Sequence, residues 1–175
     1  HGVFALANSL DHMGPMARSA ADCAAVLQVI AGWDAQDPTS LDVPVPDYMA
    51  EIGKSVRDMR IGIDRSYALG GMESQVADAL ERALEVFTHL GARVVEVTLP
   101  DYDALVDAWI GMCAIETAVA HKDTYPARAD EYGPELAQLI DEGRAMTGMQ
   151  AAEGHYLRIA FTASFETLFR YIDCM

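Results

Sequence analysis

The polar and apolar positions after residue 18 follow a helical pattern. Ser19 is a suitable N-cap, and Asp22, three residues later, places a negative charge near the positive end of the helix. The apolar run from Val26 to Ile30 continues to Gly32, a residue type that often ends helices. Because little charge interrupts this segment, we expect a helix that is buried on more than one side.

A segment rich in proline and aspartate follows this helix. Proline lacks the N–H group that helices and sheets use, so the run from Trp33 to Pro46 predicts an extended surface connector. The residues that give it this character are Asp34, Asp37, Pro38, Asp42, Pro44 and Pro46. A short helix from about Asp47 to Ile52 is expected next.

The pattern of residues 47–99 is that of a βαβ unit. Met59 to Asp64 and Ala92 to Leu99 predict two short strands, the second rich in β-branched residues. Between them, one helical face is apolar and the opposite face is charged, and Gly91 supplies a stop. Such crossovers almost always join parallel strands, so the helix should cover one face of a sheet.

Residues 100–175 show helical spacing only. We expect helices over about Asp103 to Lys122 and about Glu135 to Glu142, then a long third helix with an apolar face. That face comprises Leu157, Phe161, Phe165, Leu168 and Ile172. Two strands are too few to close a sheet, so further strands are expected from sequence outside this chain. The first residue, His1 rather than Met, also favours an interior piece of a longer protein.

Charge narrows the classes of partner. The chain has 12 basic and 27 acidic residues and a net charge of −15, and its basic residues are scattered. Nucleic-acid binding is therefore disfavoured, because it requires clustered Lys and Arg. The sequence also has no apolar run long enough for a membrane span and no signal peptide. Cys23, Cys113 and Cys174 lie far apart, which fits a reducing, cytoplasmic location.

No catalytic or metal site can be assigned from these residues alone. The five histidines form no pair at helical ligand spacing, so we expect no metal and no cofactor. Cys113 and His121 lie about 12 Å apart along a helix, too far for a nucleophile and its base. Gly70 and Gly71 lack the residues of a phosphate loop and predict a hinge.

Two further groups of residues are candidates for chemistry. Trp109, Met112, Cys113 and Glu116 share a helical face and are expected to form core packing, with a ligand pocket as the alternative. Lys54 and Lys122 are the two lysines, and each lies at a polar helix end. Both should be exposed and protonated, whereas a lysine base must be desolvated.

The run Ser9-Leu-Asp-His-Met-Gly-Pro-Met-Ala-Arg-Ser19, together with Asp37-Pro-Thr-Ser40, closely resembles the amidase signature family. Weaker matches extend over nearly the whole chain, including Leu90 to Pro100 and Arg158 to Phe165. The resemblance implies an α/β fold, an α/β/α sandwich on a mixed central sheet that is helix-rich in this part. It also implies one partial amidase domain: residues 1–46 as signature loop, buried helix and connector, 47–99 as the βαβ unit, and 100–175 as the helical part.

The family hydrolyses or transfers amides with a Ser–cis-Ser–Lys triad, and none of the three triad residues maps onto this chain. The resemblance therefore implies an amidase that acts on a small-molecule amide, with these residues inactive alone and no substrate-binding residue assigned. A homodimer stays open. In the signature loop, which includes Asp11 and His12, we expect a turn at Gly14 and Pro15 and an ion pair at Arg18.

Two alternatives remain open. The A subunit of a glutamine-dependent tRNA amidotransferase shares the loop and the connector, but there an arginine-bearing helix follows the Tyr/Phe-Gly step. Here, after Tyr132 and Gly133, that helix reads Glu135-Leu-Ala-Gln-Leu-Ile140, without a cation. A stand-alone amidase is therefore favoured. The other alternative is a binding or scaffolding chain that kept the fold and lost the site.

Overall fold

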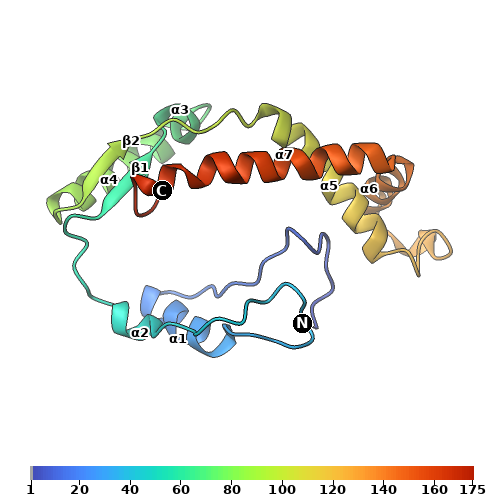
Figure 1. Ribbon diagram of the computed structural model, residues 1–175, viewed down its shortest axis with the longest axis horizontal. Helices are drawn as coiled ribbons and strands as arrows, with labels where there is room; N and C mark the ends of the chain where they lie inside the picture. Colours follow the sequence, from blue (N-terminus) through green and yellow to red (C-terminus); the bar gives the residue numbers. More distant parts are fainter. Residues whose placement is uncertain (1) are drawn as a thin grey trace. The chain divides into compact units, whose positions relative to one another are not determined.

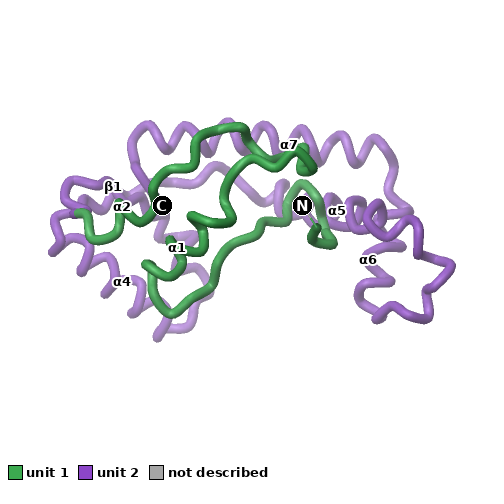
Figure 2. The backbone as a smooth tube through the Cα atoms, turned by 90° about the horizontal axis from the view of Figure 1, so that it is seen from below, with its two compact units in different colours: residues 1–54 green, residues 55–175 purple. Residues whose placement is uncertain are grey.

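The chain divides into two compact units. The computed structural model describes residues 2–175, and the first unit ends at Lys54 while the second runs from Ser55 to Met175. Figure 1 gives the order of the helices and strands, and Figure 2 colours the two units.

The first unit contains two helices and long connecting segments. Helix α1 spans Ala20–Ile30, and the Ser19 side chain accepts a hydrogen bond from the Asp22 N–H, as the sequence predicts. Helix α2 spans Tyr48–Glu51 and is capped by Asp47. The Gln28 side chain accepts a hydrogen bond from Tyr48 N at 2.8 Å and so ties the two helices together.

The predicted burial of α1 is wrong. Within this helix only Ala24 is buried, and Val29 is 83% exposed. The first unit packs α1 against the single turn of α2 and otherwise supplies only irregular backbone, so no second layer covers the helix within it. Residues 32–46 contain neither helix nor strand, which agrees with the predicted connector.

The second unit is built on a parallel pair of strands. Strand β1, Arg60–Ile63, pairs with strand β2, Arg93–Glu96, in a register that sets Arg60 opposite Arg93. Helix α4, Ser74–His89, forms the crossover, and Gly91 turns the chain back at φ +93°. The predicted βαβ unit is therefore confirmed. A short helix, α3 at Arg65–Leu69, is an addition that the sequence pattern did not predict.

The end of the chain begins a third strand beside β1. Cys174 forms a parallel bridge with Ile61, and Gly62 N donates to Cys174 O at 2.8 Å. A Cβ atom on Gly62 would lie 2.6 Å from Ile172 Cδ1, so glycine lets this segment approach. The Arg60 guanidinium also pairs with the Asp173 carboxylate at 2.6 Å. Strand β1 thus has a neighbour on both edges.

Helices make up the rest of the second unit. Their bounds are α5 Asp103–Ala120, η1 Ala129–Glu131, α6 Pro134–Ala145, α7 Gly148–Glu166 and η2 Leu168–Arg170. Thr147 and Gln150 form a capping box at the start of α7. The predicted third helix stops at Glu166, short of Leu168 and Ile172: Leu168 lies in η2, and Ile172 lies just before Cys174, the residue that pairs with β1.

The crossing of α5 and α6 depends on one glycine. A Cβ atom on Gly143 would lie 1.9 Å from the backbone oxygen of Ala114, so the two helix backbones are in direct contact there. Thr117 and Ile140, which flank this contact, are fully buried. No side chain larger than hydrogen fits without separating the helices.

We predict that Gly143→Ala lowers the free energy of unfolding by about 3 kcal/mol, because the added methyl group overpacks against rigid backbone. Urea unfolding of the second unit measures this change. Gly148→Ala is the matched control, since nothing lies within 4 Å of its Cβ position at the start of α7. Equal stability of the two variants would contradict the close crossing.

Candidate functional site

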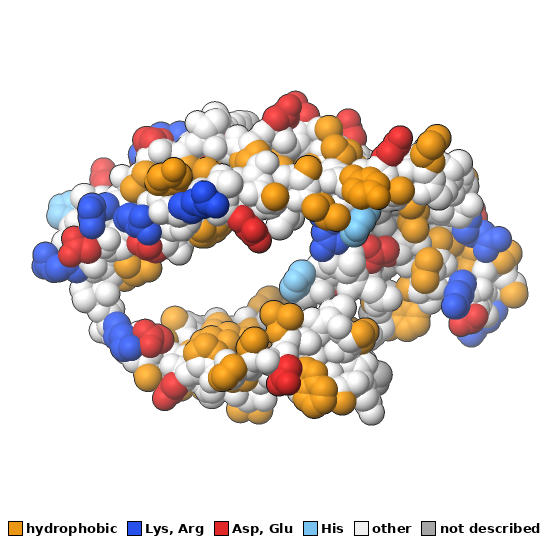
Figure 3. Space-filling model, in the orientation of Figure 1, with side chains coloured by type: hydrophobic (Ala, Val, Ile, Leu, Met, Phe, Trp, Pro, Cys, Tyr) orange, Lys and Arg blue, Asp and Glu red, His pale blue; other side chains and the backbone are white. Residues whose placement is uncertain are grey.

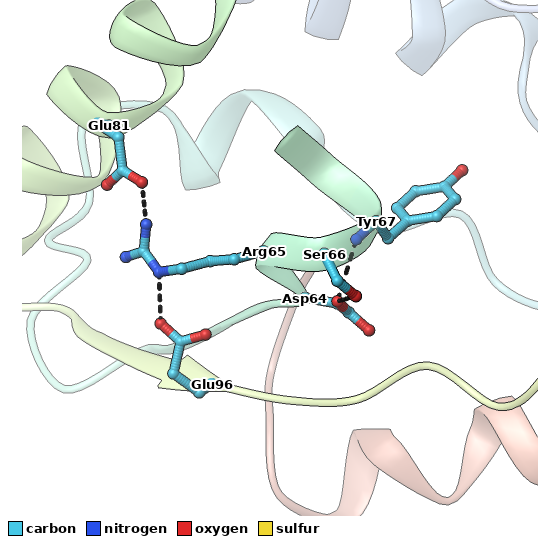
Figure 4. A network of polar contacts seen from close by, with 6 residues as sticks. All are labelled: Asp64, Arg65, Ser66, Tyr67, Glu81 and Glu96. Carbon is cyan, nitrogen blue, oxygen red and sulfur yellow. Dashed lines mark hydrogen bonds and ion pairs between the residues drawn. The ribbon is translucent and has the colours of Figure 1, made fainter. Parts of the chain in front are cut away.

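A buried carboxylate organises the carboxyl end of β1. Asp64 is 6% exposed and accepts hydrogen bonds from Ser66 Oγ at 2.6 Å and Tyr67 N at 3.1 Å (Figure 4). It also accepts a hydrogen bond from Leu99 N at 2.7 Å. These hydrogen bonds, that of Ser66 first, lower the pKa of Asp64 to about 2. Asp64 therefore stays ionised, caps α3, and fixes the segment that follows β2.

The next residue links three elements of the βαβ unit. Arg65 Nε donates to Glu96 Oε1 of β2 at 2.7 Å, and its Nη1 pairs with Glu81 of α4 (Figure 4). The hydrogen bond to Glu96, followed by the charge of Glu81, raises the pKa of Arg65. All three side chains are partly exposed, so we read this pair of contacts as a modest contribution to stability.

An apolar groove of about 600 Å³ lies beside this end of the sheet. Its walls include Ile63, Tyr67, Leu80, Tyr102, Phe161 and Phe165. The rings of Tyr67 and Tyr102 meet edge to face, with centroids 5.4 Å apart. Its lining carries no acid, base or nucleophile beyond the two phenols, so the groove can bind apolar groups but cannot perform acyl transfer.

The first unit holds a polar cleft of about 670 Å³. Residues 2–13 form one wall and residues 36–39 the other, with Asn8, Asp11, His12, Gln36, Asp37 and Thr39 as the polar lining. Asp11 Oδ2 accepts from Leu6 N at 2.7 Å and from Ala7 N at 3.2 Å, which fixes the first wall. The loop that carries the specific sequence resemblance therefore borders a cavity.

Two side chains of this cleft have defined hydrogen-bonding states. His12 Nδ1 lies 2.7 Å from Leu10 O, and because a carbonyl can only accept, this nitrogen carries the hydrogen. Asp37 Oδ1 accepts from Thr39 N at 2.9 Å and from Thr39 Oγ1 at 2.7 Å. The Thr39 side chain is the main cause of a lowered pKa at Asp37, so Asp37 is an anion at neutral pH.

The signature loop bends at a different place from the one predicted. Leu10 N and Asp11 N both donate to Ala7 O, so the turn lies at residues 7–11. Gly14 has an ordinary φ and no atom within 4 Å of its Cβ position, and the predicted turn there is wrong. Arg18 is exposed and forms no ion pair within residues 2–175, so that prediction is also wrong.

Both lysines lie at the surface, as the sequence predicts. Lys54 Nζ pairs with Glu51 Oε1 at 2.6 Å, and its side chain is 59% exposed. Lys122 is exposed just beyond the end of α5. Neither is desolvated in the way that a proton-accepting lysine requires.

The apolar stripe of α5 is only partly buried. Met112 packs beside Gly154 of α7, where a Cβ atom would lie 3.3 Å from its Cγ, which agrees with the predicted core packing. Trp109 is 52% exposed, so it is not a core residue of this chain. The stripe lines neither the groove nor the cleft. On the visible face, exposed hydrophobic side chains are spread over both units (Figure 3).

Helix α6 carries a basic side chain, that of Arg144, beyond the residues expected from the sequence. The sequence prediction ended this helix near Glu142, but it continues to Ala145 and carries Arg144 in its last turn. Arg144 Nη1 donates to Tyr125 O at 3.3 Å, and its guanidinium carbon lies 5.9 Å from the centre of the Tyr125 ring. The Tyr125 hydroxyl in turn donates to Asp141 at 2.8 Å. Arg144 therefore serves the packing of α6 in this chain.

Two kinds of site are not found in the described part of the chain. Residues 2–175 bring together no three His, Cys, Asp or Glu side chains that would hold a metal ion. The Nδ1 atom of His121 lies 2.9 Å from the Tyr132 hydroxyl. None of the helices within these residues has the length and apolar character of a membrane span.

Comparison with known proteins identifies the family. The family model described as Amidase matches residues 1–174. The chain belongs to the amidase family. AmiD of Mycobacterium tuberculosis, named as a candidate amidase, is 41% identical over the whole chain, which corresponds to 36% of AmiD. The A subunit of glutamyl-tRNA(Gln) amidotransferase of Trichlorobacter lovleyi is 32% identical over the whole chain and 41% of its own length.

The fold comparison gives the same family. A bacterial aryl acylamidase, described as an amidase signature enzyme, superimposes with a TM-score of 0.77 at 27% identity, over 91% of this chain and 34% of that one. The α/β amidase-signature fold expected from the sequence is thereby confirmed. This chain spans about a third of the length of the relatives and solved structures that it matches.

Protonation of Asp64 should weaken the second unit in acid. Because its folded pKa is about 2, below its ordinary 3.8, its contribution is complete above about pH 4 and is lost as the pH falls towards 2. We predict that Asp64→Asn lowers the urea concentration at the unfolding midpoint at neutral pH. The difference in midpoint between this variant and the natural chain should become smaller at about pH 3. Asp107→Asn, which removes an exposed carboxylate of α5, should leave the midpoint unchanged at both pH values. A gap that stays constant with pH would contradict this role.

Proposed function

We propose that the protein containing this chain is an amide hydrolase that acts on a small carboxamide by serine acyl transfer. A serine hydroxyl adds to the amide carbonyl, the C–N bond breaks, and the nitrogen leaves as ammonia after taking up the serine proton. Water then breaks the ester bond and releases the carboxylic acid. We propose further that the Ser–cis-Ser–Lys triad lies in sequence outside these residues, together with its oxyanion hole.

The exposure of the two lysines supports the proposal that the triad lies outside these residues. A lysine can accept a proton through a bridging serine only when burial has made it neutral. Lys54 is ion-paired and exposed, and Lys122 is exposed. The proton acceptor of the proposed reaction is therefore sought elsewhere in the longer protein. The role left to this chain is to supply the framework and a cleft beside the signature loop.

The surroundings of the protein are also proposals. Three unbridged cysteines support a reducing compartment such as the cytoplasm. The proposed partner is a small-molecule amide, and homodimer formation is left to measurement of the mass in solution.

A tRNA amidotransferase subunit is the second candidate, favoured by the relative that is 32% identical over the whole chain. Against it stands α6, whose residues 135–140 carry no cation and whose Arg144 is occupied with Tyr125. Release of ammonia from glutamine by the longer protein, without turnover of simple amides, would favour the subunit. The reverse pattern would favour the hydrolase.

A scaffolding role is the remaining alternative. It predicts that the longer protein forms no hydroxamate from any small amide in the presence of hydroxylamine, although it folds. The hydrolase predicts hydroxamate with at least one member of an amide panel, because hydroxylamine intercepts the acyl-enzyme.

Lysine variants of the longer protein test the proposed catalytic arrangement. We predict that Lys54→Ala and Lys122→Ala each change kcat/KM for a turned-over amide by less than about twofold, because a solvated lysine takes no part in proton transfer. Circular dichroism of each variant controls for folding. A loss of about 100-fold or more in a folded variant would make that lysine the base and overturn the proposal.

A further inference from the structure

We propose that an extended segment of the longer protein, formed by the residues that come after Met175, continues the third strand along β1 and covers the apolar groove. The surface that it occupies is the edge of β1 at Gly62 and Asp64, together with the groove beside that edge. This assignment concerns how the second unit is completed and does not rest on the proposed amide chemistry, so its failure would leave the proposed function standing.

The last residues of the chain set the direction and register of this strand. They run parallel to β1, with Cys174 opposite Ile61 (Figure 1). Cys174 N donates to Arg60 O at 3.4 Å, and Cys174 O accepts from Gly62 N at 2.8 Å. In a parallel ladder, one residue bonds in this way to the residues on either side of its partner. The next residue to do so lies two positions beyond Cys174.

The next pair of backbone groups on this edge of β1 has no partner. Gly62 O and Asp64 N point away from β2, because the backbone groups of Ile61 and Ile63 pair with that strand. Neither Gly62 O nor Asp64 N forms a hydrogen bond within residues 2–175, although both residues are buried. Unpaired backbone groups in buried residues are rare in native proteins, because each costs about as much as a lost hydrogen bond. A residue two positions beyond Cys174 donates to the first group and accepts from the second.

The groove supplies the apolar part of the same surface. Met175, Gly62 and Ile63 all line it, so it lies directly beside this edge of β1. Phe161 and Phe165 of α7, whose rings stack with centroids 5.8 Å apart, line it as well. Side chains alternate along a strand, so the residue two positions after Met175 points to the same side as Met175 and covers the groove. A small apolar ligand would leave the backbone groups of β1 unpaired, whereas an extended segment satisfies both requirements.

The relatives are long enough to contain such a segment. This chain corresponds to 36% of AmiD and to 34% of the aryl acylamidase, so most of each relative lies outside the matched residues. A segment joined directly to Met175 also has a much higher effective concentration at this edge than a second copy of the chain has. The continuing polypeptide is therefore the favoured occupant.

Hydrogen exchange of the Asp64 amide tests the proposal. The ¹⁵N-labelled chain of 175 residues is compared with the same chain extended by a short run of the residues that come after Met175 in the longer protein. We expect the extension to slow exchange of the Asp64 N–H by about 100-fold or more, because this amide gains a hydrogen bond within the sheet. The Gly62 N–H, which Cys174 O already accepts, is the internal reference and should change much less. An unchanged exchange rate at Asp64 would overturn the proposal.

Proline in the extension tests the register. As the first added residue, proline has no N–H to donate to Gly62 O, so most of the protection gained at Asp64 should be lost. As the second added residue, proline replaces an N–H that points away from β1, so the protection should remain. The second variant is the matched control, because it makes the same chemical change one position further along. Equal protection of Asp64 in the two variants would refute the register.

Methyl signals report on the groove and on a competing occupant. The extension should shift the methyl signals of Ile63 and Leu80, which line the groove, and leave that of Ile140, which is fully buried at the crossing of α5 and α6. A second copy of the chain would instead slow exchange at Asp64 as the concentration of the unextended chain rises. Such concentration-dependent protection, or methyl shifts confined to residues outside the groove, would overturn the proposal.

Discussion

The carboxylate of Asp64 is the contact on which the second unit is organised. One of its oxygens caps α3, and the other holds Leu99 N, 35 residues further along the chain. Strand β1 therefore cannot separate from the segment after β2 without breaking a charge-assisted hydrogen bond, which is stronger than one between neutral groups. The direction in which the chain leaves the sheet for α5 follows from this attachment. Arg65 adds an outer tie from the same turn to α4 and β2.

A second constraint is that a lysine acts as a base only when burial makes it neutral, and both lysines of this chain are exposed. The chain has an amidase fold and an amidase sequence, yet its ionisable side chains serve mainly as caps, ties and surface pairs. The proposed function therefore places the acyl-transfer residues outside this chain, which spans about a third of the length of relatives such as AmiD.

Local rules predicted much of the fold. The Ser19 cap and the stop at Gly91 each depend on residues a few positions apart, and each is as expected. Of the apolar face of α4, only Leu84 is buried. The contacts that the sequence could not supply span long separations, such as Ile61 with Cys174 and Asp64 with Leu99. Apolar composition alone also overestimated the burial of α1, because burial depends on what lies opposite.

The sequence predicted which loop borders the candidate site but not the geometry of that loop or the opposite wall. The resemblance marks the loop from Ser9 to Gly14 and predicts its bend at Gly14 and Pro15, whereas the backbone turns at residues 7–11. The opposite wall at Asp37 comes from a segment 25 or so residues away, and no periodicity connects the two. The tautomer of His12 depends on the position of the Leu10 carbonyl, which the sequence pattern does not specify.

The claim that these residues lack a nucleophile and its base is tested most directly by the chain itself. The purified chain of 175 residues is incubated with the panel of small amides and hydroxylamine, with the longer protein in parallel. The account predicts hydroxamate formation at the buffer background for the chain and above it for the longer protein. Turnover by the isolated chain well above background, retained through repeated purification, would contradict it.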